Sequence, residues 1–445
     1  AGLCGTALQK SRKKQKMMRW EISVMKCVRN TLLFALFFML IFLQPCSVNA
    51  AEEGAAAPEE AAPLVCVVRF SGAGLCVYGD PSLAGVPVAV LADQTQVQVL
   101  EGPMDFIARI RVPGTEVEGY TDMRFLGQAD AIVADDGLYT YEEMEEDIRQ
   151  LQARYPGLLR VDVTGTSADG RNLYALTMGG ENPTQHILVH AGIHAREYIN
   201  PLLVMEQLEK CLAFYDSGQF FGRSYRDLFS NVAVHIVPMV NPDGIAISQF
   251  GEAALRSPDL VQMVRACYAY DVAAGRTKQP YEIYLTRWKA NARGVDLNKN
   301  FPFGFALGMK ATQPSYAGYS GLLPFSEPEA ASLGSVTLQY QPSVVISYHS
   351  MGEVAYWNTT ESRYTEINRG FSSYMLTLVP YRRMGGGSAS GSYLDWIYSG
   401  ETPVRSITFE TGNVECPLPA GQYPKIRVQH DAVLPAAAWY ASSGL

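Results

Sequence analysis

Three short apolar runs from residue 187 onward each lead into histidine or carboxylate side chains. The runs and the residues that follow them are 187–191 with His194 and Glu197, 344–347 with His349, and 406–409 with Glu410. Short apolar runs bounded by polar residues are typical of buried strands. Because ligands of open α/β sheets bind at the carboxyl ends of strands, we expect these polar side chains to share one rim of a sheet.

Helix and strand signals alternate from residue 130 onward. Thr140 and Glu143 form a capping box, which predicts a helix over 141–155 that ends at Pro156-Gly157. The other predicted elements are strands at 159–164, 173–178, 187–191, 232–237, 344–347 and 406–409 and helices at 201–214, 327–340 and 425–440. This alternation predicts an α/β fold with a mixed, mostly parallel sheet flanked by helices.

Residues 64–128 have a different pattern, made of short β-like runs separated by turns. Val86, Val88 and Val90 alternate with other residues, and Gly-Pro and Pro-Gly pairs separate the later runs. Five or so short strands in this segment predict a small β-barrel, and a generic β prodomain or spacer is the alternative. We therefore expect a barrel over 64–128, followed by an α/β domain over 129–445.

The first fifty residues have the pattern of an export signal. Lys and Arg are frequent up to Arg29, residues 31–43 form an uncharged apolar block, and Val48-Asn49-Ala50 offers a cleavage site of small residues. The block is short for a bilayer span. We expect a cleaved signal peptide region over 1–50, with an uncleaved anchor as the alternative, and no stable membrane span after cleavage. Residues 51–63, rich in Ala, Glu and Pro, are expected to be a linker.

Charge and motif content exclude several classes of function. The net charge is −8, and the eight basic residues of the first fifty leave a more acidic remainder. Because nucleic-acid binding needs a basic surface, we expect no nucleic-acid partner. No C-x-x-C pair occurs, which disfavours a thiolate zinc site, and no G-x-S-x-G elbow occurs, which disfavours a serine hydrolase.

The residues at the strand ends are of the types that bind zinc. Zinc accepts imidazole nitrogen and carboxylate oxygen, and a catalytic site leaves one position open. An isolated pair such as His194 and Glu197 is weak evidence, but the chain has only six histidines and His349 also follows an apolar strand. Three strand ends of this kind together favour a metal site over unrelated polar residues.

The motifs around these strand ends resemble a known family. They are residues 192–197 (GIHARE), 241–244 (NPDG), 293–298 (RGVDLN), 348–350 (YHS) and 408–410 (TFE). In order and spacing the set resembles the zinc metallocarboxypeptidase family of the pancreatic type, over about residues 139–440. Residues 288–291 (WKAN) and 349–357 resemble its bacterial branch, the gamma-D-glutamyl-diaminopimelate peptidases, which cut peptidoglycan stem peptides. The end of the barrel segment, residues 119–127, resembles bacterial Src-homology-3-like modules of exported cell-wall hydrolases.

This resemblance implies a role for each matching residue. The implied roles are zinc ligands for His194, Glu197 and His349, general base for Glu410, a subsite arginine at Arg196, binding of the substrate's terminal carboxylate at Asn298, and a mobile tyrosine at Tyr381. The zinc ion, one per chain, would activate the attacking water. Tyr393 and Tyr398 lie near Tyr381 in the sequence and are rivals for its role.

Two positions depart from the family pattern. Lys299 follows Asn298 where the family has an arginine, and Lys289 stands near Trp288 where another arginine is usual. Lysine keeps the charge but lacks the fork that grips a carboxylate with two hydrogen bonds. Lys299 is thus a candidate for binding the substrate, with a hydrogen-bond geometry different from that of the usual arginine. Lys289 is the candidate electrophile, and Arg293 is its rival.

Together these features predict a secreted, cell-wall-associated zinc peptidase. The expected reaction is hydrolysis of a peptide bond in peptidoglycan stem peptides, with the N-terminal module attaching the enzyme to the cell wall. A general metallocarboxypeptidase acting on protein or peptide C-termini is one alternative. A non-catalytic cell-wall binding protein is another, which the intact set of His194, Glu197, His349 and Glu410 disfavours. Endopeptidase and carboxypeptidase action both remain open.

Overall fold

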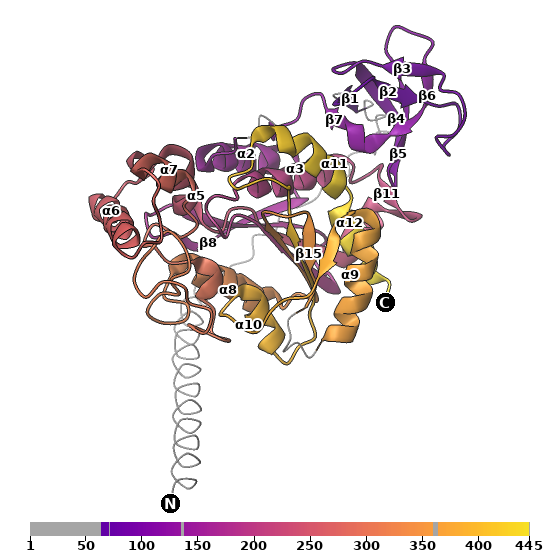
Figure 1. Cartoon of the computed structure of the whole chain (residues 1–445). Helices are drawn as coiled ribbons and strands as arrows, with labels where there is room; N and C mark the ends of the chain where they lie inside the picture. Colours follow the sequence, from indigo (N-terminus) through magenta and orange to yellow (C-terminus); the bar gives the residue numbers. More distant parts are fainter. Residues whose placement is uncertain (1–63, 71, 135–137, 359–363, 445) are drawn as a thin grey trace, which may run out of the picture. The chain divides into compact units, whose positions relative to one another are not determined.

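The computed structural model describes residues 64–70, 72–134, 138–358 and 364–444 (Figure 1). These residues belong to one compact unit. The predicted signal peptide region 1–50 and linker 51–63 lie outside the described residues. Among the helices that are described, none is long and apolar enough to cross a bilayer.

The second part of the chain is built on an eight-stranded mixed sheet. Its strands are β8 (Leu159–Thr166), β9 (Asn172–Met178), β10 (Gln185–His190), β13 (Val232–Val237), β14 (Val344–His349), β15 (Val354–Tyr356), β16 (Arg382–Met384) and β17 (Arg405–Glu410). They lie in the order β16-β15-β17-β14-β10-β13-β9-β8. The central strands β17, β14, β10 and β13 are parallel, whereas β9 pairs antiparallel with both β13 and β8. The predicted mixed sheet with a parallel centre is confirmed.

Helices cover both faces of this sheet, as Figure 1 shows. The described helices are α2 (Tyr141–Arg154), α3 (Ile199–Ala213), α4 (Tyr225–Asn231), α5 (Pro242–Phe250), α6 (Pro258–Ala273), α7 (Tyr281–Thr286), α8 (Pro328–Tyr340), α9 (Thr365–Leu378), α10 (Tyr393–Ser399), α11 (Tyr423–His430) and α12 (Val433–Ser442). Thr140 caps α2 with the predicted capping box. The single helix predicted over 425–440 is wrong, because the segment forms α11 and α12. Pro435 has no N–H to donate within the second helix, which favours a break just before it.

Side-chain alternation along the central strands decides which helices each face meets. Ile187 of β10 and Ile346 of β14 belong to the larger core, which includes residues of α3 and α12. Leu188 and Val345 point to the opposite face and pack with residues of α8 and α10. Because successive side chains of a strand point to opposite faces, each parallel strand contributes to both cores.

The first described segment is β-rich, as predicted. Its strands are β1 (Val65–Val68), β2 (Leu75–Val77), β3 (Ala89–Leu91), β4 (Gln96–Met104), β5 (Ile107–Arg111), β6 (Glu118–Asp122) and β7 (Leu126–Gln128). β1 pairs antiparallel with β4 and β7, β5 pairs with β4 and β6, and β2 pairs with β3. The resemblance of this module to Src-homology-3-like barrels stays a prediction.

The sheet of this module continues into the α/β part of the chain. The strands β11 (Gln219–Phe220) and β12 (Arg223–Ser224) form a hairpin before α4, and Gln219 pairs with Met104 of β4. The Asp105 N–H donates to the carbonyl of Gln219 at 3.0 Å. The two segments therefore share backbone hydrogen bonds, which a flexible tether between separate domains would not provide.

Candidate active site

The polar residues predicted to meet do so at the carboxyl ends of the central parallel strands. His349 and Glu410 are the last residues of β14 and β17 and are direct partners across the pair. His194 and Glu197 lie in the turn after β10, where Gly192 takes φ +66° and a Cβ atom would lie 3.0 Å from the Ile245 side chain. That turn brings its two polar residues back towards the end of β14.

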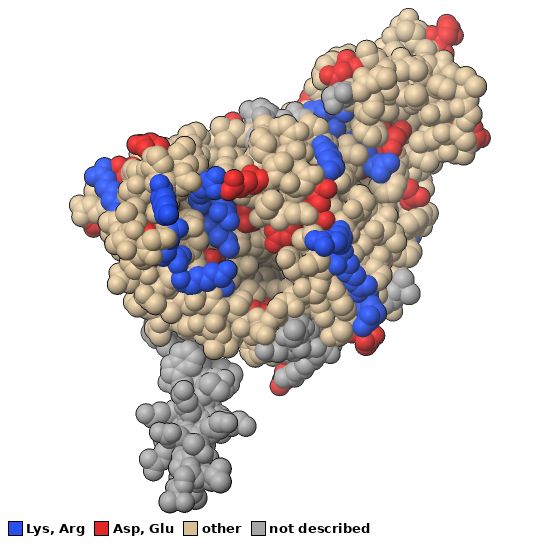
Figure 2. Space-filling view, in the orientation of Figure 1, with Lys and Arg blue, Asp and Glu red and all other residues tan. Residues whose placement is uncertain are grey.

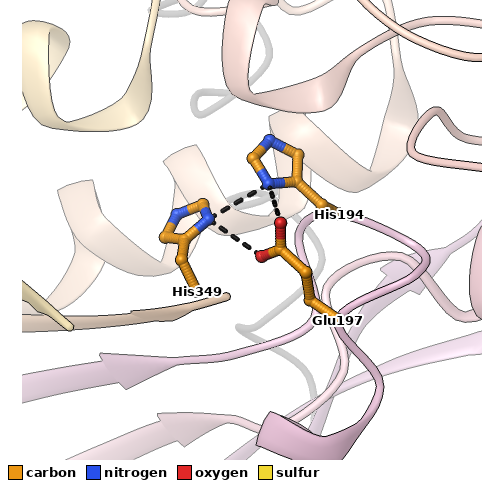
Figure 3. A group of neighbouring side chains, drawn as sticks. All are labelled: His194, Glu197 and His349. Carbon is orange, nitrogen blue, oxygen red and sulfur yellow. Dashed lines mark hydrogen bonds and ion pairs between the residues drawn. The ribbon is translucent and has the colours of Figure 1, made fainter. Parts of the chain in front are cut away.

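His194, Glu197 and His349 form a compact group of potential metal ligands (Figure 3). The Nδ1 atoms of the two histidines lie 3.1 Å apart. Glu197 Oε1 lies 2.9 Å from Nδ1 of His194, and its Oε2 lies 3.1 Å from Nδ1 of His349. All three side chains are buried. Two ring nitrogens and a carboxylate thus face a common point.

This donor set fits zinc. Two imidazole nitrogens and one carboxylate are the three protein ligands of a common catalytic zinc site, which keeps a fourth position open. The other ring nitrogen of His194 lies 3.4 Å from Oδ1 of Asp296. A carboxylate behind a ligating imidazole orients the ring and raises its basicity. Burial raises the pKa of Asp296, but the charges of Lys289 and Lys299 and the contact with His194 together hold that pKa below its usual range.

A cavity of about 560 Å³ opens beside these ligands. Glu410, Lys289 and Asn298 line it together with His194 and His349. Burial raises the pKa of Glu410 to about 7, with Glu197 adding to the shift and His349 opposing it. A carboxylate with a pKa near neutrality is suited to accept and return a proton at that pH.

The structure separates the two candidates for the electrophile. Lys289 lines the cavity, and its Nζ lies 3.5 Å from Oδ2 of Asp296. Arg293 does not line the cavity, and its guanidinium lies 3.7 Å from Glu327. The placement therefore favours Lys289 over Arg293 as the electrophile.

A second cavity of about 380 Å³ is lined mainly by basic side chains. The charged residues of its wall are Arg196, Arg276, Lys289, Lys299 and Lys310, with Asp296 as the one acid. Lys289 and Lys310 line both cavities. Burial is the main cause that lowers the pKa of Lys299. Figure 2 shows Lys and Arg side chains gathered around a hollow in this face of the protein.

Asn298 lies in the first cavity, as expected of a substrate-binding residue. Its Oδ1 accepts a hydrogen bond from the N–H of Tyr393 at 3.0 Å, which orients the amide. Its neighbour Lys299 lines the second cavity, together with Arg196.

Tyr381 is the one predicted site residue that the structure places elsewhere. Its buried ring packs against His430 and Phe409, and its hydroxyl donates to Gln429 Oε1 at 3.3 Å. The cavity wall near this part of the sequence consists instead of the glycines and serines of 386–390. Tyr381 lies just before β16, and its place in the sequence alone does not determine whether its side chain reaches the cavity or the core. Tyr393 lines the cavity but is buried, and Tyr398 is buried in the core around α8 and α10.

Several residues that line the first cavity were not predicted. Ser347 and Thr408 stand two positions before His349 and Glu410, so they share the same face of the sheet. The alternation of side chains along a strand is the sequence signal that could have identified them. Tyr356 at the end of β15 also lines the cavity, and no local pattern indicated it.

Comparisons with known proteins agree with this geometry. The zinc carboxypeptidase family matches residues 144–429. The Bacillus subtilis (strain 168) protein YqgT is 25% identical over 70% of this chain and 80% of its own length. Gamma-D-glutamyl-L-diamino acid endopeptidase 1 of Lysinibacillus sphaericus is 27% identical over 65% of this chain and 69% of its own.

A solved structure has the same fold. The crystal structure of thrombin activatable fibrinolysis inhibitor aligns with a TM-score of 0.53 at 20% identity, covering 71% of this chain and 81% of that chain. At this identity the likeness supports the fold alone. The family match, however, spans more than half of the chain and coincides with a buried His-Glu-His group at the strand ends. The chain therefore belongs to the zinc carboxypeptidase family, as a metallopeptidase whose cofactor is one zinc ion.

Proposed function

We propose that the enzyme hydrolyses a peptide bond in peptidoglycan stem peptides, at the gamma-D-glutamyl linkage to a diamino acid. The observation that carries this proposal is the basic cavity beside the metal ligands, where lysines replace the usual arginines. Diaminopimelate presents a side-chain carboxylate in addition to its main-chain one. A compact ammonium tolerates varied carboxylate positions, whereas a guanidinium fork demands one geometry. The similarity to the Lysinibacillus endopeptidase supports the same substrate class.

The site residues have distinct tasks in this reaction. Zinc, when bound by His194, Glu197 and His349, polarises the scissile carbonyl and lowers the pKa of water. Glu410 accepts the proton of the attacking water and returns it to the leaving amine. Lys289 stabilises the negative charge that develops on the carbonyl oxygen, because its ammonium is already held in place by Asp296.

The leaving side of the substrate is held by the residues between the two cavities. The Asn298 amide donates to a substrate carboxylate, and Lys299 adds a positive charge from the neighbouring wall. Arg196 stands in the same wall, and its buried Nε has no hydrogen-bond partner among the described residues. These donors position the substrate for attack without themselves reacting.

A general carboxypeptidase is the second candidate. The description of the family favours it, and Asn298 suits any C-terminal carboxylate. The comparison that separates the two is kcat/KM on a diaminopimelate-containing tripeptide against a hippuryl dipeptide. Faster cleavage of the hippuryl dipeptide would overturn the proposal and favour the general carboxypeptidase.

The Lys299→Ala variant is expected to lose activity on the stem peptide. The cost in kcat/KM should be about 1.5–3 kcal/mol, the range for a hydrogen bond to a charged group. Steady-state kinetics measures it, and Lys278→Ala is the control because Lys278 is exposed and lines neither cavity. Lys299→Arg should not restore full activity, because the fork demands a different carboxylate position. Wild-type kinetics in the alanine variant would remove Lys299 from the substrate site.

We also propose that the enzyme is secreted and associates with the cell wall through the segment 64–128. The apolar block at 31–43 supports secretion, and the resemblance of the β-rich module to those of cell-wall hydrolases supports attachment. Because β4 pairs with β11, deleting the module would also expose a strand edge of the α/β part. Attachment is therefore better tested with the full-length protein.

Full-length Glu410→Gln protein is expected to sediment with intact cell-wall sacculi even when soluble stem peptide saturates the active site. The reason is that a separate module would keep its contacts with the wall when the cavity is filled. Sedimentation with and without the soluble peptide measures the effect, and protein without sacculi is the control. Complete release by the soluble peptide would place all affinity in the active site and contradict attachment through the module.

A further inference from the structure

Lys310 stands in the wall shared by the two cavities, and the reaction described above gives it no task. It is the one charged residue in the apolar segment 301–311. An isolated lysine on an exposed loop is ordinarily a solubility feature. Its position beside the metal ligands, and the way its backbone is held, indicate a more specific role.

The backbone at Lys310 is fixed by several hydrogen bonds. Its N–H donates to the carbonyl of Gly318 at 2.8 Å, and its carbonyl accepts from Nη1 of Arg276 at 2.5 Å. Gly318 takes φ +82°, and a Cβ atom there would lie 2.9 Å from the Cβ of Lys310. The close approach of the two segments therefore depends on glycine. The base of the Lys310 side chain thus has a defined position.

Arg276 acts as a clamp for this segment. Its Nε donates to Asp271 Oδ1 at 2.7 Å, and its Nη2 donates to the carbonyl of Ala317 at 2.7 Å. With Nη1 bonded to the carbonyl of Lys310, each of its three nitrogens has a protein partner. Arg276 therefore has a structural role, because its nitrogens are all bonded within the protein, although it lines the second cavity.

The remaining cations of the second cavity are poorly compensated. Among the described residues, no carboxylate forms an ion pair with Lys310, Lys299 or Arg196, whereas Lys289 is paired with Asp296. Lys310 also lies close enough to Lys299 to lower the pKa of that lysine. Repulsion between like charges in a concave wall is relieved when an anion binds. This arrangement is notable in a protein whose net charge is −8.

We propose that Lys310 is a specificity-determining residue that binds a second carboxylate on the leaving side of the substrate. The first carboxylate is bound at Asn298, and the second reaches the wall shared with the basic cavity. The inference rests on the proposed function in taking diaminopimelate as the natural dicarboxylate. It extends that function by assigning the second carboxylate to a residue outside the family motifs.

The test compares two substrates that differ in one carboxylate. They are a tripeptide ending in diaminopimelate and the same peptide with the distal carboxylate of diaminopimelate amidated. The wild-type enzyme should favour the free carboxylate by roughly 10- to 100-fold in kcat/KM. Lys310→Met should lower this ratio to about threefold or less while changing kcat/KM on the amidated peptide little.

Two further variants separate recognition from structure. Lys310→Arg keeps the charge and should retain most of the preference, and Lys278→Met should retain all of it. Equal losses on both peptides in Lys310→Met would assign Lys310 a structural role and overturn the proposal. An unchanged ratio in that variant would overturn it as well.

A second substrate pair keeps this test independent of the proposed function. If stem peptides are not cleaved, hippuryl-glutamate and hippuryl-glutamine provide the same one-carboxylate difference on an ordinary carboxypeptidase substrate. Loss of the glutamate preference in Lys310→Met would then support the role of Lys310 although the stem-peptide assignment had failed. Cleavage of stem peptides with no effect of Lys310→Met on either ratio would leave the function standing and refute the inference.

Discussion

The His349→Ala variant is expected to lose zinc and activity together. In the wild-type protein Nδ1 of His349 faces both His194 and Glu197. Removing this side chain leaves two ligands where a stable catalytic site needs three. Zinc content after dialysis, measured by mass spectrometry of the metal, should fall from about one ion per chain to a small fraction. Turnover should fall below detection in the same preparation.

A matched histidine provides the control for this experiment. His186 lies on β10 at the end opposite the metal site, where its Nδ1 contacts Nε2 of His235. His186→Ala should keep its zinc, so that loss of metal is not a general result of removing a histidine from the sheet. Circular dichroism establishes that both variants are folded. Stoichiometric zinc in His349→Ala would show that His349 is not a ligand.

The Glu410→Gln variant is expected to keep its zinc and lose catalysis. Glutamine has nearly the same shape as glutamate but cannot accept the proton of the attacking water. The value of kcat should fall by roughly 10² or more, which is the scale of losing a general base. Substrate affinity should change little, and equilibrium binding of an uncleaved stem peptide measures it.

Glu415→Gln is the matched control for Glu410. Glu415 lies in the loop after β17, is exposed, and pairs with Arg287 rather than with the metal ligands. Its replacement should leave kcat within about twofold of the wild-type value, because exposed ion pairs contribute little to stability. If Glu410→Gln turned over at a near-normal rate, another group would have to be the base.

Local sequence patterns were sufficient to predict the central strands of the sheet and the metal group, although not the strands β15 and β16 at one edge. The apolar runs that became β10, β14 and β17 are short and buried, and each is followed by a polar residue at the edge where parallel strands end. The capping box of α2 is equally local. Such features depend on neighbours in the sequence, so one sequence contains enough information to predict them.

Features that depend on contacts between distant segments could not be predicted in the same way. Tyr381 faces the core because its ring packs against His430 of α11, a contact that no local pattern encodes. Lys310 reaches the cavities because Gly318 and Arg276 hold its segment. The hairpin β11–β12 becomes part of the N-terminal sheet through its pairing with β4. In each case a tertiary contact determines the placement.

The parallel pairing of β10 with β14 has a consequence for folding, because two of the metal ligands follow β10 and the third, His349, ends β14. Side chains alternate along a strand, so a shift of one residue between these strands would turn His349 away from His194 and Glu197. The donor atoms for the ion exist together only when the strands are correctly aligned. Zinc binding therefore adds its free energy to the native alignment and to no slipped one. In this protein the catalytic ion thus also stabilises the native register of β10 and β14.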